Sequence, residues 1–522
     1  MADNAALLEA GPRGPRTGGK RRGGAGEWSE RLAALFPQAA GPGAGGAPGR
    51  RPGRRWVGVA IQAAVVCAAA GLLLLRVAGI PAWDGTYAED NGVFLVDGLV
   101  RPWHLFVPYS GYLELGPRII GQLIASFLPI VDASAAYAIT GALIAAATGL
   151  FLYHASEGYL SARWARILLG AALVLLPIAP LDIVDSGVDS PWYAMAGLFF
   201  AVLWRPRSWP GMLAAALVAC YASSSEIVAF IYAPLLLARV IALPRVREHA
   251  VTAGWLFGLV LQVPVVMLSY EEHKQRLGAL ATPGQALAFY CHNVVLRALG
   301  WHLSVWLKSV AGYNGATVIV GAVLALALGW ALVTGDRAVR LFAAIALLTG
   351  FVQTVFDATI SPYVLFQQPT PAFMAAARYS TIPILLIAAT GIVAVDSCVR
   401  RHGPLRRHGV RQHRAFWRDG AFSRYGLFRW HWAFPRHWAF RRHGAFRRYR
   451  ARPLVAVCVL ACLLGFGWIT DFRYASQRVN AGRWLPYAQS LVTACDTAPA
   501  GGVSLNAWGG HHFTVPCARI HR

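Results

Sequence analysis

Residues 57–80 read VGVAIQAAVVCAAAGLLLLRVAGI, and the polar stretch WDGTYAEDNG follows at residues 83–92. As an α-helix, the apolar stretch extends about 36 Å, enough to cross the hydrocarbon core of a bilayer. Three carboxylates therefore stand where the chain leaves the membrane, those of Asp84, Glu89 and Asp90. Acids this close to a bilayer are costly unless they are solvated, paired or used in a function.

The composition of the whole chain is that of an integral membrane protein. Of its 522 residues, 56% are hydrophobic and 14% are charged, whereas soluble domains carry about 25% charged residues. Apolar stretches of membrane-spanning length recur along the chain, and counting them predicts about 11 transmembrane helices. We therefore expect an all-α polytopic membrane protein, and this composition excludes a large soluble enzyme.

The net charge of +24 is concentrated in two segments. Residues 1–55 contribute +6 and residues 400–452 contribute +15, so the rest of the chain is close to neutral. Cytoplasmic segments of membrane proteins carry the excess of Lys and Arg, so both segments are predicted to be cytoplasmic. This places the N-terminus inside and the C-terminus outside a multi-pass protein of the plasma membrane. The basic excess at 400–452 would also attract anionic lipid headgroups, and no nucleic acid partner is expected.

This topology divides the chain into five segments. They are a basic cytoplasmic tail expected to be disordered (1–55), a transmembrane core (56–396) with outer loops 81–130, 270–313 and 358–378, an Arg-aromatic cytoplasmic loop (397–452), a last transmembrane helix (453–470) and a small extracytoplasmic tail (471–522). From Ala415, the cytoplasmic loop consists of hexads such as AFWRDG, a period that matches neither a helix nor a strand. We interpret it as an expanded repeat, with docking on anionic lipid as the alternative.

The extracytoplasmic tail contains two cysteines, Cys495 and Cys517. In an oxidising compartment they could form a disulfide that closes a loop of about 20 residues. The sequence leaves this pairing open. The eight cysteines of the chain show no CxxC or metal-site spacing.

Two arginines of the outer loops, Arg118 and Arg378, oppose the positive-inside bias and need a partner. A phosphate group or a nearby carboxylate would satisfy a guanidinium there, so an anion site and a structural salt bridge both remain open. Among the outer acids, one could act as a general base, and a second could orient a divalent cation or a sugar hydroxyl. The alternative is a solvated loop without chemistry.

The sequence lacks the motifs of soluble nucleotide-dependent and hydrolytic enzymes. It has no P-loop, no HExxH, and no GxGxxG or GxSxG in the required context. If the chain transfers a sugar, its donor should therefore be a lipid-linked sugar reached from the outer side, not a cytoplasmic nucleotide sugar.

In this layout the chain resembles the GT-C superfamily of integral membrane glycosyltransferases. The resemblance covers residues 57–396 and rests on the acids after the first span, on an amphipathic stretch at Pro108–Pro129 and on Arg378-Tyr379 before a late span. The segment GYLELGPRIIGQL at residues 111–123 also resembles actinobacterial membrane proteins of this type.

The resemblance implies transfer of a sugar from a polyprenyl-phosphate donor to an extracytoplasmic acceptor. It implies catalytic roles for Asp84, Glu89 and Asp90, donor-phosphate binding by Arg118, Arg378 and Tyr379, and leaves open a divalent metal ion held by Asp84 and Asp90. The superfamily usually carries an Asp-Asp or Asp-Glu pair, whereas the adjacent pair here is Glu89-Asp90. The base therefore stays open between Asp84 and Asp90.

Two other classes of function compete with a transferase. A transporter or lipid flippase would show charged residues within spans or broken helices, and Glu226 beside Ser223, Ser224 and Ser225 is the candidate for this. A non-catalytic membrane scaffold would use the Arg-aromatic loop as its binding element.

Overall fold

The computed structural model describes residues 32–38, 52–85, 90–175, 186–269, 282–360, 377–402, 446–475, 482–506 and 512–520. Helices dominate these residues. Six of the described helices are long and apolar enough to cross a membrane, namely Trp56–Leu74, Ile130–Gly158, Val246–Leu268, Trp301–Trp330, Arg337–Thr359 and Arg378–Arg401. The architecture is that of an all-α membrane protein, as expected, while the count of about 11 spans and their orientation stay predictions.

The elements follow one another as a run of helices with few strands. The first half contains α2 (Pro52–Leu74), β1 (Val77–Ala78), η1 (Ala82–Asp84), η2 (Asp90–Leu95), α3 (Val96–Val100), α4 (Leu115–Phe127), η3 (Ile130–Asp132), α5 (Ala133–Ala155), η4 (Ser156–Gly158), α6 (Arg163–Val174), α7 (Ser190–Leu203), α8 (Trp209–Ser225), η6 (Ile227–Tyr232) and α9 (Ala233–Ala242). The second half contains η7 (Val246–His249), α10 (Ala250–Leu268), α12 (Pro283–Phe289), η8 (Tyr290–Val295), η9 (Leu296–Leu299), α13 (Trp301–Thr334), α14 (Arg337–Ile360), α16 (Ala377–His402), α18 (Phe446–Thr470), β2 (Tyr474–Ala475), α19 (Trp484–Thr497), β3 (Gly502–Asn506), β4 (His512–Pro516) and α20 (Cys517–Ile520).

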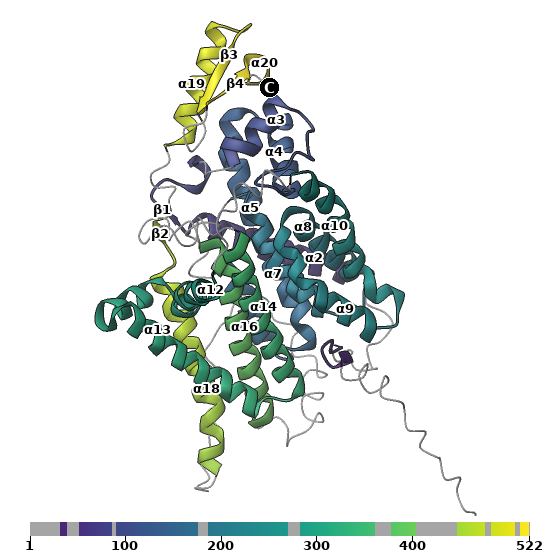
Figure 1. Cartoon of the computed structure of the whole chain (residues 1–522), viewed down its shortest axis with the longest axis vertical. Coiled ribbons are helices and arrows are strands. Elements are labelled where there is room, and N and C mark those ends of the chain that lie inside the picture. The colour runs from purple at the N-terminus through teal and green to yellow at the C-terminus, as the bar shows by residue number, and fades with distance from the viewer. Residues whose placement is uncertain are drawn as a thin grey trace, which may run out of the picture.

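Helix α7 is the centre of the bundle. Every residue from Ser190 to Leu203 is buried, because this helix is apolar around its whole circumference. It contacts α5, α8 and α16 (Figure 1). Helix α7 is thereby held against three neighbouring helices.

Small residues bring neighbouring helices into backbone contact. A Cβ atom at Gly170 of α6 would lie 2.6 Å from the carbonyl oxygen of Gly149 in α5. A Cβ atom at Gly254 of α10 would lie 2.2 Å from the carbonyl oxygen of Ala216 in α8. Close approach of this kind is the usual way in which membrane helices gain packing energy.

Helices α2 and α13 lie at the outside of the bundle and expose apolar side chains. Only 11% of the apolar window of each helix is buried, and Trp56 and Val318 are 75% and 69% exposed. In a membrane, lipid tails would cover such side chains, since they are as apolar as the side chains themselves. Helix α13 bends at Gly312, whose φ of 68° is accessible to glycine without strain.

The end of the chain folds into a small unit whose apolar core is continuous with buried side chains of α3, α4 and α5. Helix α19 packs on the antiparallel hairpin of β3 and β4, and a disulfide joins Cys495 to Cys517. The pairing that the sequence left open is therefore formed. Figure 1 shows this unit, coloured yellow, at one end of the molecule beside α3 and α4.

A short part of the N-terminal tail packs against the helical bundle. Phe36 is fully buried, and the guanidinium of Arg239 stacks 5.7 Å from its ring centre. The hydroxyl of Tyr159 donates a hydrogen bond to the carbonyl oxygen of Leu35. The remainder of residues 1–51, and residues 403–445 of the Arg-aromatic loop, lie outside the described residues.

Candidate functional site

Asp84, at the end of η1, holds the C-terminal unit in place. Its carboxylate is buried and accepts hydrogen bonds from Arg483 Nε at 2.5 Å and from the backbone N–H of Leu485 at 2.9 Å. Both carboxylate oxygens of Asp84 are thus engaged by the segment that begins α19. Asp84 was predicted to be catalytic, but its contacts are those of a structural residue that joins two segments of the chain.

Asp90 begins η2 and faces the segment that precedes α7. Its side chain is buried, with Oδ2 3.1 Å from Ser186 Oγ and Oδ1 2.8 Å from the backbone nitrogen of Val188. Helix η2 has π-helical hydrogen bonding, an arrangement that is frequent at functional sites. Between the two donors, a Cβ atom at Gly187 would lie 2.7 Å from the ring of Tyr137, so only glycine fits there.

Arg378 reaches the same segment from α16. Its Nη1 lies 3.4 Å from Oδ1 of Asp189, and the backbone N–H of Asp189 donates to Ser186 Oγ. The guanidinium also stacks over the ring of Tyr379, which meets the ring of Trp192 edge-on. Asp90 and Arg378, two residues predicted from sequence, therefore converge on one short stretch, residues 186–189.

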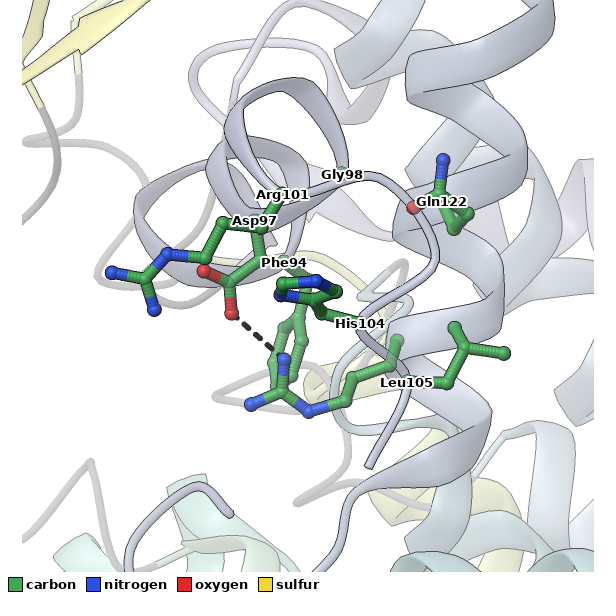
Figure 2. Close-up of a pocket in the computed structure, with 8 residues that line it drawn as sticks. Phe94, Asp97, Gly98, Arg101, His104, Leu105 and Gln122 are labelled. Atoms are coloured by element: carbon green, nitrogen blue, oxygen red, sulfur yellow. Dashed lines mark hydrogen bonds and ion pairs between the residues drawn. The ribbon is translucent and has the colours of Figure 1, made fainter. Parts of the chain in front are cut away.

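Arg118 forms the salt bridge that was one of its two predicted roles. Its Nη1 lies 2.7 Å from Oδ2 of Asp97, and its guanidinium stacks 5.5 Å from the ring centre of Phe94. Figure 2 shows Phe94 and Asp97 together with His104 around the adjoining pocket. The pocket is lined by Phe94, Asp97, Gly98, Arg101, His104, Leu105, Arg118 and Gln122.

Glu226 marks a break between helices at the end of α8. The chain leaves the α-helical conformation there, with φ −136° and ψ 123°, before the 3-10 helix η6 begins. Glu226 lies outside the helices that are candidates for membrane spans, yet only 5% of it is exposed. Burial raises its pKa to about 8, opposed by the charge of Arg378 and reinforced by the charges of Asp357 and Asp189.

The segment at residues 109–118, which includes the start of α4, covers this break. The backbone N–H of Gly116 donates to Ser225 Oγ at 2.9 Å, and that of Leu113 donates to Gln262 Oε1 at 3.0 Å. Burial, reinforced by Glu114 and Glu226, raises the pKa of Tyr112 well above its ordinary value. Its hydroxyl is therefore a neutral donor at physiological pH.

A divalent-metal site of the kind considered from the sequence finds no support in the geometry of the described side chains. Across the described ranges, no group of three or more His, Cys, Asp or Glu side chains gathers as a metal site. Asp84 and Asp90, the two ligands considered from sequence, are bound to different segments of the chain. Glu89, the third predicted acid, lies outside the described residues.

Sequence reasoning missed Ser186, Asp97 and Asp357. Ser186 and Asp97 are polar residues in loops or short helices, where nothing in the sequence indicates a distant partner. Asp357 carried a usable signal, because an aspartate within an apolar stretch is by itself a candidate functional residue. Comparison with protein-family models, curated proteins and solved structures finds no match to this chain.

Proposed function

We propose that this protein is a membrane-embedded glycosyltransferase of GT-C-like layout. It would transfer a sugar from a polyprenyl-phosphate donor to an acceptor on the extracytoplasmic face. The observation that supports the proposal is the convergence of Asp90 and Arg378 on residues 186–189. A carboxylate and a guanidinium that contact the same short segment supply the two charges that such a transfer requires.

In this proposal Asp90 is the general base. The acceptor hydroxyl attacks the anomeric carbon of the donor and gives its proton to the Asp90 carboxylate. The bond between the anomeric carbon and the phosphate oxygen breaks, and its electron pair leaves with that oxygen. Hydrogen bonds from Ser186 and from the backbone of Val188 fix the orientation of the base, which is what positional catalysis needs.

Arg378 is the proposed partner of the leaving phosphate. A guanidinium matches phosphate geometry with two parallel hydrogen bonds, and it stabilises the charge that develops as the phosphate departs. The side chain of Arg378 is 23% exposed, so part of it remains reachable while Asp189 holds the rest. Asp84 and Asp90 are both buried with both carboxylate oxygens bound. The proposal takes Asp90 as the base because its partners lie in the segment that Arg378 reaches, and it assigns Asp84 to anchoring the C-terminal unit, which supplies its partners.

The test is sugar transfer by the purified full chain in lipid vesicles. The vesicles would receive a panel of polyprenyl-phosphate monosaccharides that are radiolabelled in the sugar. Acceptors extracted from the outer leaflet of the cell membrane would be added with them. Asp90→Asn should lower transfer by at least about 100-fold, because a general base contributes that much or more. Asp132→Asn, an exposed acid in η3, is the control and should transfer normally. Normal transfer by folded Asp90→Asn protein would refute the mechanism.

A second function is favoured by the break at Glu226. Transporters bind substrates and ions where helices are broken, and the helical conformation is broken at the buried Glu226, between α8 and η6. A lipid flippase of this kind would move a fluorescent lipid between vesicle leaflets, and Glu226→Gln would abolish that movement. Flipping by the wild type, together with no sugar transfer, would place this function ahead of the transferase.

A further inference from the structure

Three buried polar side chains of α14 and α16 lack hydrogen-bond partners among the described residues. They are Gln353 and Asp357 in α14 and Ser380 in α16, each fully buried. Both amide atoms of Gln353, both carboxylate oxygens of Asp357 and the hydroxyl oxygen of Ser380 have no partner within hydrogen-bonding geometry, although Gln353 lies close enough to Asp357 to act on its carboxylate. Buried polar atoms are nearly always satisfied in folded proteins, so a set of this kind requires an explanation.

These side chains share one interface. Gly350, Gln353 and Asp357 are spaced by three and four residues, which places them on the same face of α14. A Cβ atom at Gly350 would lie 3.2 Å from the Cα atom of Pro383, so this face of α14 packs on α16. Ser380 stands three residues before Pro383 and therefore lies on the face of α16 that meets α14.

The direction of the two helices brings Ser380 level with Gln353. Phe342 near the start of α14 packs on Tyr159, and Ser161, two residues later, binds Asp396 near the end of α16. The helices therefore run antiparallel, side by side (Figure 1). Gly350 of α14 and Pro383 of α16 lie at the same level because they are in contact. In antiparallel helices, three residues after Gly350 is level with three residues before Pro383, so Gln353 and Ser380 also lie at one level.

The charges around Asp357 leave a negative excess. Asp357 interacts electrostatically with three groups: the guanidinium of Arg378, the hydroxyl of Tyr232 and the carboxyl of Glu226. Arg378 already pairs with Asp189. Within the described part of the chain, neither Asp357 nor Glu226 forms an ion pair. A buried carboxylate in this position needs a positive charge close to it.

The chemistry of these unpartnered atoms distinguishes among three sources of positive charge: a proton, a monovalent cation and a divalent cation. A proton on Asp357 would cancel its charge and could be shared with the Gln353 amide, but it would leave the hydroxyl of Ser380 without a partner. A cation held by oxygen would satisfy the charge and the oxygen atoms of all three side chains together. A divalent ion normally takes several carboxylates, and among the described residues no three acidic, His or Cys side chains gather here.

We propose that Asp357, Gln353 and Ser380 form a binding site for a small monovalent metal cation, with Na⁺ as the ion of matching chemistry. The ligands are the carboxylate oxygens of Asp357, the amide oxygen of Gln353 and the hydroxyl oxygen of Ser380. The ion links α14 to α16 next to the residue pair Arg378–Asp189. This site is separate from the proposed transferase chemistry and does not depend on it.

Thermal unfolding of the full chain in lipid nanodiscs tests the site. NaCl would replace choline chloride at constant ionic strength, and the unfolding temperature would be followed against Na⁺ concentration. A ligand that binds only the folded protein raises stability in a saturable way, so the wild type should show a saturable rise. Asp357→Asn should abolish the Na⁺ response, and Ser380→Ala should weaken the apparent affinity by about tenfold.

The control is Asp336→Asn at the opposite end of α14. Asp336 caps this helix through the backbone N–H of Val339, and Asn is an equally good cap, so the Na⁺ response should be unchanged. If Asp357→Asn does not fold, the apparent Na⁺ affinity of Ser380→Ala, compared with that of the wild type, decides whether the site exists. The proposal is overturned if Na⁺ and choline act alike on the wild type, or if only pH changes its stability. Because no activity is measured, the outcome is independent of the transferase proposal.

Discussion

Arg483 Nε lies 2.5 Å from Oδ2 of Asp84, which joins two segments that are 399 residues apart in sequence. Two neighbouring contacts strengthen this junction. Strand β1 pairs in parallel with β2, and the indole N–H of Trp484 donates to the carbonyl oxygen of Ile130. The C-terminal unit is therefore fastened to the loop that follows the first apolar helix, and the carboxylate of Asp84 is part of the fastening.

The first prediction concerns this junction. Asp84→Asn should destabilise the docking of the C-terminal unit by about 1–3 kcal/mol, because a buried acceptor of two hydrogen bonds is altered. Limited proteolysis between α18 and α19 would measure it, with faster cleavage expected in the variant. Asp132→Asn serves as the control. Cleavage of Asp84→Asn at the wild-type rate would show that the ion pair does not hold the unit.

The second prediction concerns the disulfide between Cys495 and Cys517. The two residues are separated by 22 positions, and a cross-link over such a loop stabilises a fold by about 3 kcal/mol. Cys495→Ser, or reduction of the wild type, should unfold the C-terminal unit at a lower temperature. Thiol alkylation with a membrane-impermeant reagent, before and after reduction, would report both the bond and the side of the membrane. Labelling of Cys517 without reduction would contradict the bond.

The third prediction concerns Gly187, which lies between Asp90 and Tyr137. In Gly187→Ala, the added Cβ atom would sit 2.7 Å from the ring of Tyr137 and 3.4 Å from Oδ1 of Asp90. Overpacking of this kind costs about 1–3 kcal/mol of folding free energy and should displace the Asp90 carboxylate. The free energy of unfolding and the transfer rate should therefore both fall.

The control for that variant is Gly71→Ala in α2. A Cβ atom there meets nothing within 4 Å, so the change should leave transfer unaltered. It should slightly raise stability, since alanine favours a helix by about 1 kcal/mol over glycine. Equal effects of the two substitutions would show that the contact of Gly187 with Tyr137 has no special importance.

The fourth prediction concerns pH. Burial raises the pKa of Glu226 from 4.5 to about 8, so the folded protein binds this proton more tightly than the unfolded chain. Between those two values the folded state holds more protons, and stability must fall as the pH rises through this window. Unfolding temperatures measured from pH 4.5 to 8.5 should decline, and Glu226→Gln should flatten the decline. A variant with the same slope as the wild type would rule out Glu226 as its source.

Several features of this protein were predictable from local sequence. Apolar stretches identify a membrane protein because crossing a bilayer requires a continuous apolar segment, and that requirement involves no distant residue. The outer acids and arginines were recognisable for the same reason, since their cost depends on their distance from the bilayer. Gln353 and Asp357 could also have been noticed, because their spacing by four residues places them on one helix face.

The partners of these residues depended on the tertiary structure. Asp84 and Asp90 are six positions apart, yet one binds Arg483 and the other binds Ser186. Arg118 and Arg378 share the same sequence signature, yet one pairs with Asp97 in a neighbouring short helix and the other with Asp189 at the start of α7. Hydropathy and charge fix the depth of a residue in the membrane. Its neighbours at that depth are set by helix packing, which no local pattern in the sequence encodes.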